Sequence, residues 1–409
     1  MSTNVVIIGS ALSGNKGAAA MLEAAIEGLS ARVPGIRFTL LSMYPEEDRQ
    51  LNRYSNLEVV SASPFRLGVV INSLALLHRI LPPLRPAIQR GSAAIGALSQ
   101  ADVMLDQGGI TFSDGREKFL LYNVASILPA LMLGVPVVKC AQAIGPFESR
   151  INRLVARIFL PKMALIVTRG RITHGFAQDL ELKNIQPGAD LAFTLDHSDL
   201  GGAANDAFVS GLRPDRNGTV GLAPSVVLEK KFDRTGGDYA AEMVQFIEYL
   251  AARKLQVLLL PHSARTKINA THNNDLPLCR KIYQALSHSA QEYTIFIDEE
   301  WSARALRNAI SHCDVFVTSR FHAMVSGLAT GTPTLVIGWS HKYQEVLEMF
   351  GADRWAFSHQ ELNQESLRSR FEEMWKQRDE IAAKLKGGLP GVRAKASLQL
   401  DHILTLLKD

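Results

Sequence analysis

Short apolar runs and Ala/Leu-rich segments alternate along most of the chain. The first apolar run, residues 4–9, ends in glycine as buried parallel strands often do, and an Ala/Leu-rich helix is predicted over 17–29. Further strands are predicted at 38–42, 57–61, 101–105, 136–140 and 164–168, and in the second half at 219–223, 256–260, 294–297, 315–317 and 334–337. Repeated strand–helix units of this kind predict an α/β fold with doubly wound parallel sheets.

A polar stretch rich in Gly, Asp and Asn, residues 196–217, interrupts this alternation. A chain of 409 residues is longer than one ordinary domain. We therefore predict two doubly wound domains, 1–195 and 218–385, with 196–217 as the linker and a C-terminal helix at 386–409. Open α/β sheets bind ligands at the carboxyl ends of their strands, so we expect both domains to face a common cleft.

Composition is that of a soluble globular enzyme, with 47% hydrophobic and 21% charged residues. The net charge of +4 only weakly favours anionic partners, and no basic run suggests nucleic acid. Cys140, Cys279 and Cys313 lie in or beside apolar segments, which predicts buried free thiols in a reducing cytoplasm and no structural zinc site. The chain enters a strand at once, so no signal peptide is predicted.

The most apolar stretch, residues 67–84, lies within a longer helical segment, 65–100. His78, Arg79 and two prolines interrupt it, and its apolar part is too short to span a bilayer. Two interpretations stay open. The segment is either a core helix or an amphipathic element that lies on a membrane or a partner, which would place the protein peripherally on the inner face of the membrane.

The glycine-rich turn after the first strand resembles a phosphate loop only superficially. Gly9 and Gly14 have the required spacing, but residues 15–17 read Asn-Lys-Gly where that loop needs Gly-Lys-Ser/Thr. We interpret it as a strand-to-helix turn that lets a ligand approach closely.

Residues 314–338 carry the most informative pattern in the chain. An apolar strand is followed by Ser319, a candidate N-cap, and then by a helix that opens with Arg320 and His322. A helix N-terminus at a strand end attracts anions, so Arg320 is a candidate anion ligand and His322 a candidate proton carrier. The alternative is a surface cation and a histidine bonded to a loop.

Other strand ends add groups of the same character: Asp106, Gly108, Gly109, Arg169, Arg171 and His262. The set contains no Asp-x-Asp for a divalent ion and no serine in a GxSxG elbow. It best fits a small, multiply charged anion that arginines clamp and a histidine protonates.

Several motifs together resemble the polysaccharide pyruvyl transferase family, in family order over about residues 1–350. The matching pieces are Gly14-Asn15-x-Gly17, Gly108-Gly109, Gln142-Ala143-Ile144-Gly145-Pro146-Phe147, Thr168-Arg169, Asp190-x-Ala192-Phe193, Pro261-His262, Asn274-Asp275, and Ser319-Arg320-Phe321-His322-Ala323 followed by Gly331-x-Pro333 and Lys342.

The resemblance implies two facing Rossmann-like domains of the glycosyltransferase-B type. It implies transfer of pyruvate from phosphoenolpyruvate to two hydroxyls of a sugar as a cyclic ketal, in exopolysaccharide or cell-envelope glycan synthesis. Phosphoenolpyruvate is then the co-substrate, with no other cofactor and no metal. Whether the saccharide acceptor is lipid-linked and whether the chain forms a homo-oligomer stay open.

The resemblance also implies residue roles. Arg169 and Arg320 would bind the donor, and His322, with His262 as a weaker candidate, would transfer protons. Groups of the acceptor side or cleft would be Asn15, Asp106, Gly108 and Gly109. For three residues a structural role is the alternative to a role in the reaction: a helix N-cap for Asp275, a turn residue for Asn15 and a surface cation for Arg171.

The chain departs from the family pattern at Ala18, where some members carry an acid, and at 170–174, where Asp or Glu plus Ser is usual. Two alternatives from other classes remain. One is a nucleotide-sugar glycosyltransferase of the same fold, although no acidic residue for a ribose lies between Arg320 and Gly331. The other is a non-catalytic relative that binds a polysaccharide or envelope partner.

Overall fold

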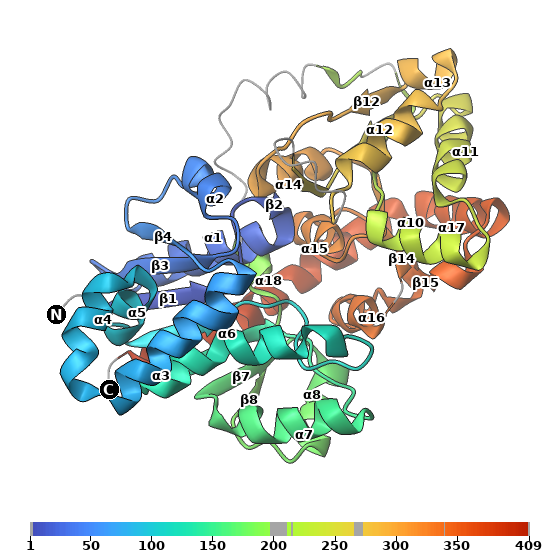
Figure 1. Cartoon of the computed structure of the whole chain (residues 1–409). Helices are drawn as coiled ribbons and strands as arrows, with labels where there is room; N and C mark the ends of the chain where they lie inside the picture. Colours follow the sequence, from blue (N-terminus) through green and yellow to red (C-terminus); the bar gives the residue numbers. More distant parts are fainter. Residues whose placement is uncertain (1–2, 197–210, 214–215, 266–272, 339, 408–409) are drawn as a thin grey trace. The chain divides into compact units, whose positions relative to one another are not determined.

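A seven-stranded parallel sheet forms the centre of the first unit of the computed structural model (Figure 1). The structure describes residues 3–196, 211–213, 216–265, 273–338 and 340–407. The strand order is β4-β3-β1-β5-β6-β7-β8, and each paired neighbour is parallel. The strands are β1 (Asn4–Ile8), β3 (Arg37–Ser42), β4 (Leu57–Ser61), β5 (Val103–Asp106), β6 (Val137–Gln142), β7 (Leu165–Thr168) and β8 (Ile185–Pro187).

A six-stranded parallel sheet forms the centre of the second unit, with the order β12-β10-β9-β13-β14-β15. Its strands are β9 (Thr219–Ala223), β10 (Gln256–Leu259), β12 (Thr294–Phe296), β13 (Val315–Thr318), β14 (Thr334–Gly338) and β15 (Ala356–Ser358). Both strand orders extend in two directions from a central strand. This confirms the predicted α/β fold with doubly wound parallel sheets.

Helices connect the strands in both units (Figure 1). Those of the first half are α1 (Lys16–Ser30), α2 (Pro45–Leu51), α3 (Asn72–Ile80), α4 (Arg85–Gly91), α5 (Ala93–Ser99), α6 (Leu120–Leu133), α7 (Arg150–Phe159) and α8 (Arg171–Asp179). Those of the second half are α10 (Val226–Phe232), α11 (Tyr239–Ala252), α12 (Leu276–Gln284), α13 (His288–Glu292), α14 (Ala303–Ser311), α15 (Phe321–Thr330), α16 (His341–Glu348), α17 (Gln364–Lys376) and α18 (Arg378–Leu406).

The chain divides into two compact units. The first unit consists of residues 1–13, 18–194 and 393–409, and the second of 14–17 and 195–392. The predicted domains, 1–195 and 218–385, stay a prediction. No sequence pattern indicates that residues 14–17 pack with the second unit or that the chain end packs with the first. The C-terminal helix also starts earlier than expected, at Arg378. Most of the predicted linker lies outside the described residues.

Residues 14–17 join the second unit through a two-stranded antiparallel sheet. β2 (Gly14–Asn15) pairs with β11 (Ser263–Ala264), and Asn15 lies opposite Ser263. Gly14 has a φ of +70°, a backbone conformation that glycine adopts without steric cost. This short sheet fixes the glycine-rich turn next to the carboxyl end of β10.

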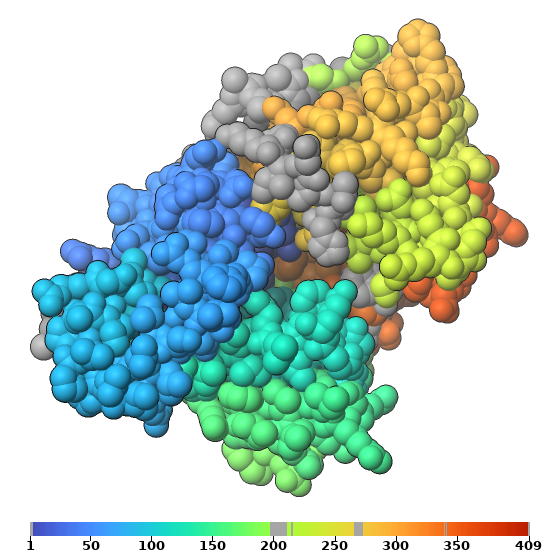
Figure 2. Space-filling model, viewed as in Figure 1, coloured from blue at the N-terminus to red at the C-terminus, as the bar shows by residue number. Residues whose placement is uncertain are grey.

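The apolar segment 65–100 is helical, as predicted, and lies at the surface of the first unit (Figure 2). It comprises a π-helical turn, η1 (Arg66–Ile71), followed by α3, the short 3₁₀ turn η2 (Pro82–Leu84), α4 and α5. Its inward face packs into the core through Leu67, Ile71 and Ala75. Its outer face is exposed, so the core-helix interpretation holds for one face only.

All three cysteines are buried and free.

The last turns of α18 pack on the first unit. Leu400 is 1% exposed, and a Cβ built on Gly28 of α1 would lie 2.5 Å from Leu400 Cδ1. Gln399 Nε2 donates to the carbonyl oxygen of Ala189 at 3.0 Å. The absence of a side chain at Gly28 therefore lets Leu400 of the chain end pack directly against α1.

This packing predicts that Leu400→Ala lowers the free energy of unfolding by about 2–5 kcal/mol, because it leaves a cavity against α1. Leu398→Ala on the same helix is the matched control, since Leu398 is 49% exposed and its truncation should cost under about 0.5 kcal/mol. Urea unfolding of both variants measures the difference. Equal losses would show that the chain end does not stabilise this unit.

Candidate functional site

The carboxyl end of β5 places Asp106 and two glycines in the first unit. Asp106 is 2% exposed, and its Oδ1 accepts the backbone N–H of Gly108 at 2.9 Å. Gly9 has a φ of +80°, and a Cβ built on it would lie 2.6 Å from the nitrogen of Gly108. The lack of a side chain at Gly9 therefore permits the ends of β1 and β5 to approach closely.

Asp106 is engaged in a buried polar network. Lys139 Nζ lies 2.5 Å from Asp106 Oδ2 and donates at 3.1 Å to Gln142 Oε1. Gln142 in turn donates to the carbonyl of Asp106 and accepts from the hydroxyl of Thr111. A buried lysine stays in place only where such partners compensate its charge. Asp106 therefore holds Lys139 and the Gly108 backbone, and its carboxylate is not a loose group at the surface.

Arg169, at the end of β7, is 1% exposed. Its Nε donates to the carbonyl of Ala141 at 2.8 Å and lies 3.3 Å from Asp190 Oδ2. A Cβ built on Gly109 would lie 3.8 Å from Arg169 Nη2. The structure thus brings together Asp106, Gly108, Gly109 and Arg169, while Arg171 is exposed at the start of α8, as a surface cation would be.

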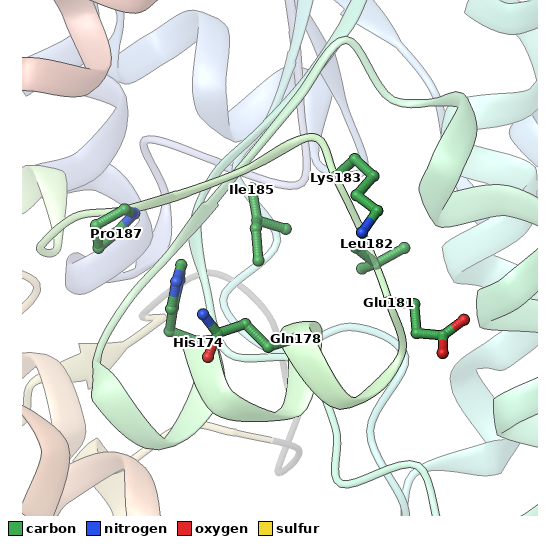
Figure 3. A pocket seen from close by; sticks show the side chains of 7 residues that line it. All are labelled: His174, Gln178, Glu181, Leu182, Lys183, Ile185 and Pro187. Atoms are coloured by element: carbon green, nitrogen blue, oxygen red, sulfur yellow. The ribbon is translucent and has the colours of Figure 1, made fainter.

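The first unit also has a surface hollow of about 740 Å³ (Figure 3). Its lining comes from α8, the following turn and β8: His174, Gln178, Glu181, Leu182, Lys183, Ile185 and Pro187. His174 Nδ1 lies 3.0 Å from the hydroxyl of Thr168, so the ring is tied to the last residue of β7. None of the predicted site residues belongs to this lining, so we do not assign the reaction to it.

In the second unit, β13 and α15 position residues 319–323, which we call the Arg320 motif. Arg320 itself is the N-cap residue of α15, without a side-chain cap. The prediction of a Ser319 cap is wrong, because the Ser319 hydroxyl lies 2.8 Å from that of Tyr239 and its carbonyl accepts from Tyr343 at 3.0 Å. These two bonds fix the turn that brings Arg320 to the start of the helix.

A buried ion pair with Asp275 orients the Arg320 guanidinium. Nη2 pairs with Asp275 Oδ1, and Nη1 donates to Asn273 Oδ1 at 2.7 Å. Asp275 is fully buried and also accepts the backbone N–H groups of Val226 and Ser263, each at 3.0 Å. Burial raises the pKa of Asp275, and the guanidinium and these N–H groups act in the opposite direction.

Asp275 therefore does not cap α12. It occupies the N-cap position, but its side chain makes no capping hydrogen bond there. Asn274 Oδ1 accepts the N–H of Leu276 at 3.2 Å in its place. The expectation of a helix-capping aspartate is corrected: its carboxylate joins the segments of Val226 and Ser263 to Arg320.

His322 lies in the first turn of α15 against the glycine-rich turn. A Cβ built on Gly17 would lie 1.9 Å from His322 Cγ, so the imidazole occupies the space of a side chain at position 17. Asn15 Oδ1 accepts the N–H of Gly17 at 3.1 Å, which is the role of a turn residue. Only glycine fits at position 17, because any side chain there would overlap the ring of His322, the predicted proton carrier.

His262 completes the set in this unit. It is 2% exposed, and its Nε2 lies 3.5 Å from the Ser326 hydroxyl. Burial holds the pKa of His262 well below its usual range, and the positive charges of His322, Arg320, Arg307 and Lys16 lower it further. The ring is therefore neutral at physiological pH.

Sequence reasoning missed Lys16, Glu300 and Lys139. Lys16 is 2% exposed, its Nζ lies 2.5 Å from Glu300 Oε1, and the same oxygen accepts from Gly14 N–H at 3.1 Å. The sequence alone could not reveal that Glu300 contacts this turn, because the two segments are far apart along the chain. Lys139 could have been found, since it is the one charged residue within a strand that is otherwise apolar or uncharged.

The depressed pKa predicts that His262 makes stability depend on pH. In the unfolded chain the histidine takes up a proton below its pKa of about 6.5, whereas the buried ring of the folded protein stays neutral. The contribution of His262 to the free energy of unfolding is therefore lost as pH falls below about 6.5. His262→Gln should reduce the slope of the unfolding free energy against pH by up to about 1.4 kcal/mol per unit. His288→Gln, at a ring 91% exposed, is the control. Urea unfolding between pH 7 and pH 5 measures the slopes, and equal slopes in all three proteins would contradict the assignment.

Among the residues that the structure describes, no three side chains of His, Cys, Asp or Glu are placed so that they could hold a metal ion. Among the same residues, no helix is both long and apolar enough to cross a bilayer.

Solved structures of similar fold are glycosyltransferases and epimerases. The chain matches UDP-GlcNAc 2-epimerase of Neisseria meningitidis, bound to UDP-GlcNAc, with a TM-score of 0.63, 11% identity and complete coverage of both chains. It matches glycosyltransferase SnogD of Streptomyces nogalater with a TM-score of 0.55, 14% identity and complete coverage of both. At such identities the likeness concerns the fold, which is of the glycosyltransferase-B type.

Sequence comparison is more specific. The chain is 21% identical over 383 residues to the amylovoran biosynthesis protein AmsJ of Erwinia amylovora, with 88% of each chain covered. The family model for polysaccharide pyruvyl transferase matches residues 15–341, which include Asn15 and Gly17, both groups of strand-end residues and the Arg320 motif. This protein therefore belongs to the polysaccharide pyruvyl transferase family.

Proposed function

We propose that the protein transfers pyruvate from phosphoenolpyruvate to two hydroxyls of a sugar as a cyclic ketal, in exopolysaccharide or cell-envelope glycan synthesis. Family membership and the relative involved in amylovoran biosynthesis support the class of reaction. The observation that carries the donor assignment is the Arg320 guanidinium, oriented by Asp275 at the start of α15 beside His322.

Phosphoenolpyruvate fits this arrangement by charge. It carries a carboxylate and a phosphate, and the N-terminus of α15 adds backbone N–H groups and a partial positive charge to Arg320. Asp275 and Asn273 occupy Nη2 and Nη1, whereas Nε is buried and makes no hydrogen bond to the described residues. An oxygen of the donor would satisfy Nε, because a buried donor without a partner is costly.

The reaction requires two proton movements. One sugar hydroxyl and then the other form bonds to C2 of the donor, and the bond between C2 and the phosphate oxygen breaks. Of the two hydroxyl protons, one balances the proton added to C3, which becomes a methyl group, and the other balances the proton that phosphate carries away. We assign protonation of C3 to His322 and propose His262 as the weaker candidate for removal of a hydroxyl proton.

The remaining residues keep separate proposed roles. Arg169, in the first unit, is proposed as a second donor ligand. Gly108 and Gly109 are proposed to let the acceptor approach the backbone, with Asp106 orienting them. Asn15 is proposed to act through the turn that carries Gly17, with any acceptor contact secondary to this.

We predict that phosphoenolpyruvate stabilises the wild-type protein against heat and that Arg320→Lys loses most of this effect. A lysine keeps the charge next to Asp275 but loses the planar fork that engages Asn273 and the donor. At about 100 times its Kd, a ligand stabilises the native state by about 2.7 kcal/mol, which a thermal-shift titration detects. Arg280→Lys is the control, since Arg280 lies in an exposed pair with Asp298.

Equal shifts in wild type and Arg320→Lys would contradict the donor assignment. A shift with a uridine diphosphate sugar, and none with phosphoenolpyruvate, would favour a nucleotide-sugar glycosyltransferase.

For His322 we predict a loss in kcat of about 10²–10⁴-fold on substitution by alanine, with the thermal shift by phosphoenolpyruvate retained. Phosphate release from phosphoenolpyruvate, with a panel of nitrophenyl hexosides as acceptors, measures the rate. His288→Ala is the matched control, because its ring is almost fully exposed. Turnover of His322→Ala near that of wild type would reject the role.

Gly17→Ala tests the position of His322 without removing it. The added methyl group cannot coexist with the ring where it lies, so His322 must move. We predict a fall in kcat approaching that of His322→Ala, since small displacements of a catalytic group cost about 10²-fold. Unchanged kcat in Gly17→Ala would show that the observed ring position is not required.

A further inference from the structure

The outer surface of one helical layer of the first unit is unusual in composition. η1, α3, α6 and α7 all contribute to the core cluster that contains Val6 and Met104. These two residues are paired in register between β1 and β5, so they lie on the same face of the sheet. The helices therefore cover that face together, with α3 packed against α6 (Figure 1).

The first part of this surface lies on the segment from η1 to α4. Val69, Leu76 and Ile80 are 50%, 48% and 57% exposed, while Leu67 and Ala75 on the opposite side are fully buried. A surface helix normally presents polar residues to water. Here both sides are apolar, and the segment forms part of the outer surface of the unit (Figure 2).

The second part lies on α7. Ile151, Leu154 and Ile158 are 66%, 61% and 46% exposed and follow one another at helical spacing on a single side. Ala156 faces inward and is fully buried. We call the exposed apolar residues of the two parts, with the exposed basic residues of the same segments, the apolar–basic face.

The exposed charged side chains of η1 to α4 and of α7 with the turn after it are all basic: Arg66, Arg79, Arg85, Arg90, Arg150, Arg153, Arg157 and Lys162. Neither 59–101 nor 149–178 contains an acidic residue. The acids that flank these ranges are Glu58 on β4, Asp102 before β5, Glu148 before α7 and Asp179 at the end of α8. The face therefore has one sign of charge.

We propose that the apolar–basic face docks on an anionic lipid bilayer. Aliphatic side chains on surface helices insert into the boundary of headgroups and acyl chains, while arginines extend to the lipid phosphates. Self-association through this face would bring the basic side chains of two copies into one interface without acids to pair them, which charge repulsion disfavours. An anionic surface satisfies both the apolar and the basic side chains.

The test is flotation of the full chain with vesicles, which needs no knowledge of the reaction. We expect flotation with phosphatidylcholine vesicles that contain about a third phosphatidylglycerol, weakened by salt, and none with pure phosphatidylcholine. Arg79→Gln and Arg153→Gln should each lower the partition coefficient about fivefold.

Apolar contact is tested separately. Ile80→Glu combined with Leu154→Glu should abolish flotation, whereas Leu398→Glu, at an exposed leucine of α18, should leave it unchanged. All three sites are exposed, and circular dichroism checks that the variants stay folded.

Three results would overturn the proposal. The first is no flotation with anionic vesicles. The second is equal flotation of the double variant and Leu398→Glu. The third is a stable dimer in light scattering that Ile80→Glu dissociates, since the face would then be covered by a second copy.

Discussion

The arrangement of the second unit depends on one buried carboxylate. Asp275 accepts backbone N–H groups from the segments after β9 and β10 and pairs with the guanidinium after β13. Three strand ends are thereby tied to one side chain. A charge removed from water in this way is stable only if all its partners are present, so the carboxylate constrains each of them. Arg320 is held in a fixed direction as a consequence, and the start of α15 with it.

The same physical solution recurs in the first unit with the signs exchanged. There a buried lysine, Lys139, is held by Asp106, Gln142 and Thr111 at the ends of β5 and β6. In both units a compensated buried charge fixes the backbone where parallel strands end, which is where such folds place ligands. The glycines of both sites then allow the close approaches that these networks require, Gly9 to Gly108 and Gly17 to His322.

The sequence was sufficient for most of the strands, because runs such as Val5–Ile8 are apolar and end at turn residues. The three-residue strands β8 and β15 were not predicted. The sequence also indicated that Arg169 and Arg320 follow strand ends. It failed where a long-range partner decides. Ser319 has the identity of a cap but bonds to Tyr239, and Asp275 occupies a cap position but pairs with Arg320. The two-residue strand β2 is too short to have a periodicity, so its pairing with β11 left no pattern to read.

In the proposed reaction, C3 of phosphoenolpyruvate becomes the methyl group of a ketal. Carbon-13 NMR of [3-¹³C]phosphoenolpyruvate, in D₂O with the enzyme and a hexoside acceptor, tests this reaction directly. We expect the olefinic signal to give way to a methyl signal with one deuterium, attached to a quaternary ketal carbon that bonds two oxygens of the sugar, with phosphate released in equal amount. An unchanged olefinic signal, while a nucleotide sugar is consumed under the same conditions, would contradict it.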